Sequence, residues 1–169
     1  MKKFILLLLK PFSFLPALCM MYLIFSFSGQ TGEASSSLSY DISHKIIVTA
    51  DQVLDKNLSA ERISYYTDRI HTPVRKAAHM TEYFILAICV SFPLYVYGLR
   101  GILLFLFAGF ICVGFACTDE LHQSFVAGRE PSKRDVCIDS AGVLTGLILF
   151  SLIKHQIAKH SEKKKTCKN

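Results

Sequence analysis

Apolar residues in this chain are gathered into four long stretches that carry almost no charge. They cover residues 4–27, 77–99, 101–118 and 136–153. The hydrocarbon core of a bilayer is about 30 Å thick, and a helix needs roughly 17 to 25 mostly apolar residues to cross it. A helix also pairs its own backbone polar groups, as lipid requires. The pattern therefore predicts an all-α integral membrane protein, a single domain over residues 1–169 with four transmembrane helices.

The first stretch follows Lys2 and Lys3 and in this respect resembles a signal peptide. Its apolar run is longer than the roughly 7 to 15 residues of such a segment, so we expect a retained membrane anchor. Thr72 followed by Pro73 is a typical helix start and predicts that the second span is entered there. Gly142 and Gly146 lie four residues apart in the fourth span, a spacing that predicts close helix packing.

The segment 28–75 between the first two spans is polar, and its start is rich in serine and glycine, which predicts a loop. From residue 38 to 54 apolar residues recur near helical spacing, and a second short helix is expected after Ser59. Such amphipathic helices either lie on the outer leaflet or pack against the bundle as a lid. The apolar positions in the two helices are Ile42, Ile46, Ile47, Val53 and Leu54, then Ile63, Tyr66 and Ile70.

The composition is 51% hydrophobic and 19% charged with a net charge of +6. Disordered chains, collagen-like repeats and basic proteins that coat nucleic acids contain far fewer apolar residues, so these classes are excluded and no nucleic-acid partner is expected. Membrane lipid is the expected surrounding. The six cysteines contain no CxxC pair and imply no disulfide framework. Five of them lie in the spans, where we expect small apolar fillers.

Alternation of the four spans divides the charges between two membrane faces. The face with both termini holds 10 Lys and Arg and one acidic residue, or +9, and the opposite face holds 9 and 12, or −3. The positive-inside rule then favours a cytoplasmic membrane protein with both termini in the cytoplasm. The Lys-rich tail, residues 154–169, either faces anionic lipid of the inner leaflet or is a solvated segment.

Ionisable residues gather where the second span starts, the third ends and the fourth starts. Hairpin topology brings these three places, with the end of the first span, to one membrane face. Arg75, His79 and Glu82 lie on one helical face at i, i+4 and i+7. The candidate residues for chemistry are His79, Glu82, Asp119, Glu120 and His122. The candidate residues for binding a ligand are Arg75, Tyr83, Gln123, Arg129, Arg134, Asp135 and Asp139.

Several interpretations of this cluster remain open. In a catalytic site, His79 or His122 would work with Glu82 or Glu120 as general acid and base, while arginines held an anionic group such as the phosphate of a lipid carrier. A non-catalytic site for lipid phosphate or peptide carboxylate would use the same residues. In a structural cap, Arg129 and Arg134 would form ion pairs with acidic residues, namely Glu82, Asp135 and Asp139.

A metal centre is a further alternative, because His79, Glu82, Asp119, Glu120 and His122 are of types that Zn²⁺ or Mn²⁺ accepts. Their spacing matches no recognised metalloprotease pattern, and we predict no metal ligands. The sequence leaves any other cofactor, and the oligomeric state, undetermined.

Three motifs, in this order and on three spans, resemble the VanZ-like family of bacterial membrane proteins. They are RKAAHMTEYF at 75–84, TDELHQSF at 118–125 followed by Gly128-Arg129, and RDVCIDSAG at 134–142. The resemblance covers roughly Leu23 to Leu149. Many members of the family have asparagine where this chain has Asp139, which favours a hydrogen-bonding role for that residue.

The resemblance implies a four-span inner-membrane protein with a role in the cell envelope. The name-giving member of the family is associated with reduced susceptibility to teicoplanin, which acts at the outer membrane face on cell-wall precursors. An outward-facing polar cluster fits this location. We therefore expect a site that binds or acts on an anionic envelope intermediate, either a polyprenyl phosphate lipid or a peptidoglycan precursor, and that lowers teicoplanin susceptibility. The alternative is a structural or partner-binding membrane protein with an ion-paired cap.

Overall fold

The computed structural model describes residues 10–166, and all regular structure in this range is helical, which confirms the all-α class. In chain order the elements are η1 (Lys10–Phe14), α2 (Leu15–Ser28), α3 (Gly32–Leu54), α4 (Ala60–Val96), α5 (Gly101–Gln123) and α6 (Lys133–Thr166).

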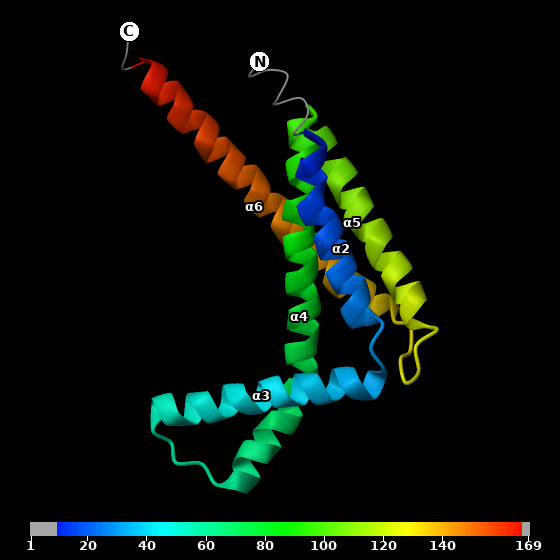
Figure 1. Ribbon diagram of the computed structural model, residues 1–169. Coiled ribbons are helices and arrows are strands. Elements are labelled where there is room, and N and C mark those ends of the chain that lie inside the picture. The colour runs from blue at the N-terminus through cyan, green and yellow to red at the C-terminus, as the bar shows by residue number, and fades with distance from the viewer. Residues whose placement is uncertain (1–9, 167–169) are drawn as a thin grey trace.

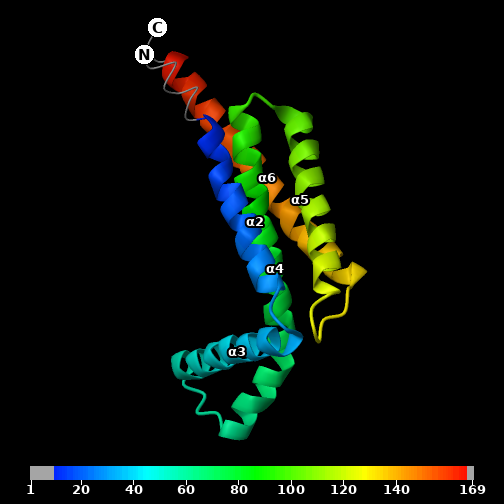
Figure 2. The ribbon, with the colours of Figure 1, turned by 45° about the vertical axis from the view of Figure 1, so that its right-hand side comes forward.

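Four helices form a bundle, and one lies across its end. Figures 1 and 2 show α2, α4 and α5 side by side, α6 crossing behind them at an angle, and α3 running crosswise below. Among the described residues, four helical stretches are long and apolar enough to cross a membrane: Lys10–Ser28, Ala60–Val96, Gly101–Gln123 and Lys133–His160. The predicted four-span integral membrane protein is therefore confirmed.

Helix α4 is much longer than the predicted second span. It begins after Ser59, whose Oγ accepts a hydrogen bond from the Arg62 N–H, and it continues through Pro73. The predicted helix start at Thr72 is wrong. A proline removes one backbone hydrogen bond and bends a helix, and Figure 1 shows that α4 changes direction near its crossing with α3. Packing against α3, with Thr67 buried on α4, offsets that loss.

Helix α3 begins earlier than predicted. Its N-cap is Thr31, whose Oγ1 accepts a hydrogen bond from the Ala34 N–H, so the serines at 35–37 are helical and the predicted loop there is wrong. Ser39 and Ser43 are buried, and each hydroxyl donates to the backbone carbonyl four residues earlier. Small side chains with internally satisfied hydroxyls let α3 pack on α4, as one of the two alternatives predicted.

The core of the bundle consists of one face from each span. On α5 the buried residues recur every fourth position, at Leu104, Ala108, Cys112 and Ala116. The last three form one cluster with Tyr83, Leu86 and Ala87 of α4, Val143 and Leu147 of α6, and Ala17 and Ile24 of α2. Large apolar side chains on the opposite faces are exposed, as suits helices that contact lipid.

Two glycines allow α6 to cross α4 at close range. A Cβ on Gly142 would lie 2.2 Å from the Met80 carbonyl oxygen, and one on Gly146 would lie 2.4 Å from the Phe84 carbonyl oxygen. No side chain fits at such distances, so the close packing predicted from the glycine spacing is confirmed and occurs within the chain.

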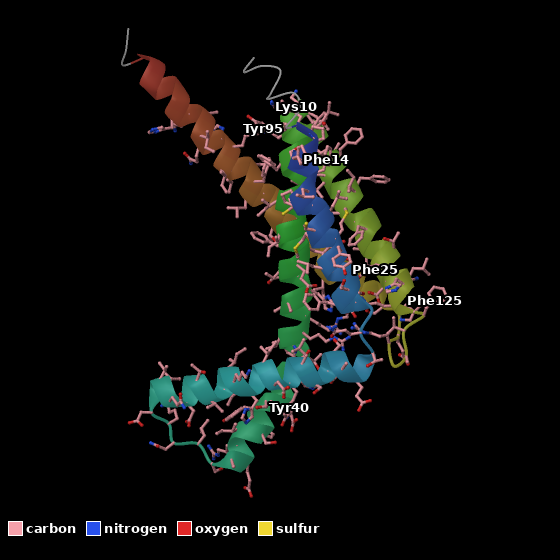
Figure 3. All side chains as sticks on the ribbon, in the orientation of Figure 1. Lys10, Phe14, Phe25, Tyr40, Tyr95 and Phe125 are labelled. Carbon is pink, nitrogen blue, oxygen red and sulfur yellow. The ribbon has the colours of Figure 1, made fainter. Side chains whose placement is uncertain are left out.

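Basic and aromatic residues meet at the end of the bundle opposite α3. The Lys10 ammonium lies 5.7 Å from the ring centre of Tyr97, and Arg100 and Lys154 lie 3.7 and 6.0 Å from that of Tyr95. Figure 3 shows Lys10 and Tyr95 at this end. Such residues are typical of a membrane–water interface. The three basic residues share one end, as the predicted topology requires, and their assignment to the cytoplasm stays a prediction.

The five cysteines in the described residues are free thiols. Cys112 is buried in the core, as expected of a small filler. Cys19, Cys117 and Cys137 are exposed on the outer faces of the helices, so the filler prediction is wrong for these three. Periodicity around the spans did not separate core-facing from lipid-facing positions, because both are apolar.

Candidate functional site

A polar cavity of about 220 Å³ lies where α3 meets the end of the bundle. Its walls come from α3, the middle of α4, the end of α5, the loop before α6 and the first turns of α6. Helices α3, α4, α5 and α6 thus all contribute to it, while η1 and α2 do not. The lining residues are Ser36, Ser39, His71, Thr72, Arg75, Lys76, His79, Glu120, Gln123, Gly128, Arg129, Glu130, Asp135, Ile138 and Asp139.

Seven of the predicted site residues line this cavity, and five do not. The seven are Arg75, His79, Glu120, Gln123, Arg129, Asp135 and Asp139. Glu82 and Tyr83 lie further along α4, inside the bundle, and Asp119 is turned into the core. Arg134 is exposed and lies outside the cavity.

His122 also lies outside the cavity. Its ring stacks on Phe25 of α2 with centroids 4.0 Å apart and an interplanar angle of 26°. Figure 3 shows Phe25 near the end of α2 that is closest to α3. The histidine available to a ligand in the cavity is therefore His79 or His71, since these two rings line its wall.

Sequence reasoning missed several lining residues. On α4 the missed residues are His71, Thr72 and Lys76. They share one helical face with Arg75 and His79, and this spacing would have been visible had Pro73 not been taken as a helix start. Ser36 and Ser39 of α3, together with Glu130 and Ile138, carry no comparable signal. Only the crossing of α3 under the bundle brings the two serines to the site.

Asp119 joins the ends of two spans. Its Oδ2 accepts a 2.9 Å hydrogen bond from the Ser28 hydroxyl of α2 and a 3.2 Å bond from the Gln123 amide one turn later. Ser28 is fully buried and Asp119 is 2% exposed. A buried carboxylate needs such donors, so this residue fixes the position of α2 against α5.

Arg129 clamps the loop before α6 onto the end of α2. Its Nε donates to the Gln30 carbonyl at 3.1 Å, Nη2 to the Phe27 carbonyl at 3.3 Å and Nη1 to Gln123 Oε1 at 3.1 Å. Carbonyls at a helix C-terminus lack intrahelical donors and favour a cation. Burial, and then the nearby charge of Arg75, lower the pKa of Arg129 from its usual value.

The predicted ion-paired cap has different partners in the structure. Among the residues described through His160, the ion pairs are Lys76 with Asp135 at 3.0 Å and the His79–Glu82 contact. Arg129 is occupied by carbonyls and an amide, and Arg134 is exposed. Their predicted pairing with acidic residues is therefore wrong. The buried guanidinium of Arg129 donates instead to backbone carbonyls at the end of α2.

A short hydrogen bond fixes the loop on its other side. Glu120 Oε1 accepts from the Ser132 backbone N–H at 2.7 Å, directly before α6 begins. The loop also approaches α3 through backbone atoms: Gly32 N–H donates to the Ala127 carbonyl at 3.0 Å, and a Cβ on Gly32 would lie 1.9 Å from the Gly128 oxygen. These contacts close the cavity between α3 and the loop.

His79 and Arg75 line the cavity and have free capacity for a ligand. His79 Nδ1 lies 3.4 Å from Glu82 Oε2, a long contact that leaves the ring at the cavity wall. The half-buried Arg75 guanidinium makes no hydrogen bond or ion pair with the residues that the structure describes. An unpaired guanidinium beside a second one, Arg129, is a position at which an anion is favourable.

Five buried polar atoms have no hydrogen-bond partner within the described chain. They are Glu82 Oε2, Tyr83 Oη, Asp119 Oδ1, His122 Nδ1 and Asp139 Oδ1. Such atoms are rare in proteins and are often connected with function. All five belong to residues singled out from the sequence, although only Asp139 lines the cavity. Among the described residues, no three His, Cys, Asp or Glu side chains are arranged to hold a metal ion.

Four spans with a cavity of ionisable residues at one end define a multi-span α-helical membrane protein with a polar site near the membrane surface. The family model described as VanZ/LLP1 matches residues 13–154, and the chain belongs to this family. The resemblance seen in the sequence motifs is thereby confirmed. No curated protein and no solved structure matches the chain.

Proposed function

We propose that this protein binds the phosphate group of an anionic cell-envelope lipid in the cavity between α3 and the bundle. The observation that carries the proposal is the pair of arginines at the cavity wall. Arg75 has no partner among the described residues, and its charge is close enough to Arg129 to lower the pKa of that group. A phosphate between them would replace this repulsion by attraction, with charge-assisted hydrogen bonds from Arg75 and the positive charge of Arg129 nearby.

The acidic residues at the cavity differ in how strongly their negative charges would repel a phosphate. Asp135 is paired with Lys76, and Glu120 accepts a hydrogen bond from a backbone N–H. Asp139 is 5% exposed and one of its oxygens is unpartnered. We assign it the role of a hydrogen-bond acceptor toward His79, whose ring lines the same wall.

Cavity size favours a headgroup over a complete precursor. A volume of about 220 Å³ is smaller than the roughly 300 to 1,000 Å³ of pockets that enclose drug-sized ligands. It suits one or two phosphate groups, whereas the disaccharide and peptide of a peptidoglycan precursor would have to lie outside. A polyprenyl phosphate lipid is therefore the ligand class that we favour.

Placement at the outer face of the cytoplasmic membrane is part of this proposal and rests on the charge difference between the two ends. A protein that holds a phosphate lipid there would alter the supply of the cell-wall precursors on which teicoplanin acts. Lowered teicoplanin susceptibility is the expected consequence in a host that depends on this lipid.

A second candidate function is acid–base chemistry on the bound headgroup. It is favoured by the contact between His79 Nδ1 and Glu82 Oε2 at 3.4 Å, because a histidine oriented by a carboxylate is a common proton acceptor or donor. In this function the other ring nitrogen of His79 would face the ligand, and the arginines would stabilise its charge.

Binding of a long-chain polyprenyl monophosphate by the purified full chain in phosphatidylcholine nanodiscs tests the first proposal. Arg75→Gln should weaken this binding about tenfold or more, since a charge-assisted, bidentate contact is lost. Arg134→Gln removes an exposed arginine in the first turn of α6, outside the cavity, and is the matched control, so its affinity should equal that of the parent. Equal affinities for all three proteins would contradict the proposal.

Teicoplanin susceptibility separates binding from chemistry. A sensitive Gram-positive host would express the parent or a variant at matched membrane abundance. Protection by the parent and by Arg134→Gln, but not by Arg75→Gln, is the expected result. If His79→Gln keeps lipid affinity and loses protection, the site does chemistry; if it keeps both, the site only binds.

A further inference from the structure

One face of α3 is apolar and is not covered by the other residues that the structure describes. Ile42, Ile46 and Val53 recur along this face and are 43%, 46% and 77% exposed. With Lys45, Thr49, Ala50 and Leu54 they line a shallow, open groove of about 620 Å³ along α3 itself. Ser39 and Ser43, which face α4, lie next to this stripe on the helix, so the groove begins beside the contact between α3 and the bundle.

The position of α3 in the fold indicates which molecules can reach this groove. Figures 1 and 2 show α3 running crosswise at the end of four helices that are long and apolar enough to cross a membrane. When these helices cross the bilayer, α3 runs along the membrane plane. At this depth lipid headgroups meet their hydrocarbon chains, and amphipathic helices lie with an apolar face at that boundary. A groove here is reached by lipid chains from the side.

The same helix lines both the polar cavity and the apolar groove. Ser36 and Ser39 belong to the cavity wall, and the groove starts at Ile42, three residues later. At a rise of 1.5 Å per residue, the distance from Ser39 to Leu54 is about 22 Å. A phosphate in the cavity would therefore lie beside one end of the groove, which extends from there along the same helix.

We propose that the α3 groove holds the hydrocarbon chain of the lipid whose phosphate occupies the cavity, so that the protein recognises an intact phosphate lipid by two adjoining surfaces. This inference rests on the proposed function and adds the chain to the recognised structure. Lys45 is the charged residue at the groove, and its apolar stem can cover the chain while its ammonium stays in the headgroup region.

Affinity for two probes tests the inference in nanodiscs of constant phosphatidylcholine composition. One probe is the long-chain polyprenyl monophosphate, and the other is a water-soluble short-chain alkyl monophosphate. Ile46→Asn should weaken binding of the long-chain probe about tenfold, because an apolar contact is replaced by an amide, and should leave the short-chain probe unchanged. Leu38→Asn changes an equally exposed apolar residue of α3 outside the groove and is the matched control.

The two proposals fail in different ways. If Arg75→Gln weakens both probes while Ile46→Asn weakens neither, the chain is not held on α3 and only the cavity proposal stands. If Arg75→Gln weakens neither probe, the cavity proposal itself is wrong. Equal losses for Leu38→Asn and Ile46→Asn would mean that α3 rests on bulk lipid, and a dimer abolished by Ile46→Asn would assign the groove to a second copy; either result overturns the inference.

A photoreactive chain gives an independent readout. A polyprenyl phosphate with a diazirine near the middle of its chain should cross-link to residues 42–54 in the parent, and an excess of unlabelled lipid should prevent the reaction. Cross-links confined to the lipid-facing sides of α2 and α5 would contradict the inference. Because the substitutions above are on an exposed face, matched helix content and melting temperature would exclude misfolding as the cause of lost labelling.

Discussion

The hydroxyl of Ser28 donates a 2.9 Å hydrogen bond to the carboxylate of Asp119 and thereby ties the end of α2 to the end of α5, 91 residues apart in sequence. Both residues are buried, and Oδ1 of the same carboxylate has no partner in the described chain. Loss of the serine hydroxyl would leave the buried carboxylate with the Gln123 amide alone.

Ser28→Ala is therefore expected to destabilise the fold by about 1 to 3 kcal/mol, the usual effect of leaving a buried acceptor short of a donor. Ser26→Ala is the control, because the Ser26 hydroxyl bonds only to the Tyr22 carbonyl on an exposed face. Chemical unfolding in mixed micelles measures both. Equal stabilities of the two variants would show that the bond between α2 and α5 contributes little.

Replacement of Arg129 by lysine tests the clamp on the loop. A lysine ammonium cannot reach Gln30, Phe27 and Gln123 in the planar arrangement that the guanidinium uses. The expected loss of stability is about 2 kcal/mol or more, since hydrogen bonds from a charged group are lost. Limited proteolysis of the loop 124–132 should become faster than in Arg134→Lys, whose side chain is exposed; unchanged cleavage would contradict the clamp.

The crossing of α4 and α6 predicts a strong effect of a single methyl group. In Gly142→Ala, the added Cβ would lie 2.2 Å from the Met80 carbonyl, so the helices must separate, at a cost of about 1 to 3 kcal/mol. Gly114→Ala is the matched control, because nothing lies within 4 Å of its Cβ and alanine is the better helix former. Thermal unfolding should place the control at or above the parent and Gly142→Ala clearly below it.

The contact between α3 and the loop 124–132 predicts that Gly32→Ala weakens ligand binding more than it lowers the stability of the fold. A Cβ on Gly32 would lie 1.9 Å from the Gly128 carbonyl oxygen, so Gly32→Ala must move α3 away from the loop and widen the cavity. We expect at least about a tenfold loss of phosphate-lipid affinity with a small change in melting temperature, since both segments lie at the surface of the bundle. In Gly29→Ala the nearest atom is 3.4 Å away, and affinity should be retained.

Several of these features were accessible from the sequence. The bilayer requires long apolar helices, so the four spans are visible as hydropathy alone, and their alternation brings the polar ends to one face whatever the details of packing. The spacing of Gly142 and Gly146 likewise predicted the close crossing. The seven predicted residues at the cavity were found because a charged or strongly polar side chain at the edge of a span is uncommon and therefore informative.

Other features depended on contacts between segments far apart in the chain. The Thr72-Pro73 signal is a local preference for a helix start, and packing of α3 on α4 overrides it. The partners of Arg129 could not be predicted, because a long guanidinium side chain bonds to whichever carbonyls the end of α2 brings within reach. Ser36 and Ser39 have no local signal at all and join the site only through the crossing of α3.

The sequence by itself thus determined the class of protein, its four spans, its family motifs and the gathering of ionisable residues at one end of the bundle, because each follows from solvent requirements or from spacing along a helix. Only the tertiary structure decided which of those residues share a cavity, which are used to hold the helices together and which helix closes the site. Those outcomes depend on the crossing angles of helices and on distances of a few ångströms between side chains, and neither quantity is encoded in a local pattern.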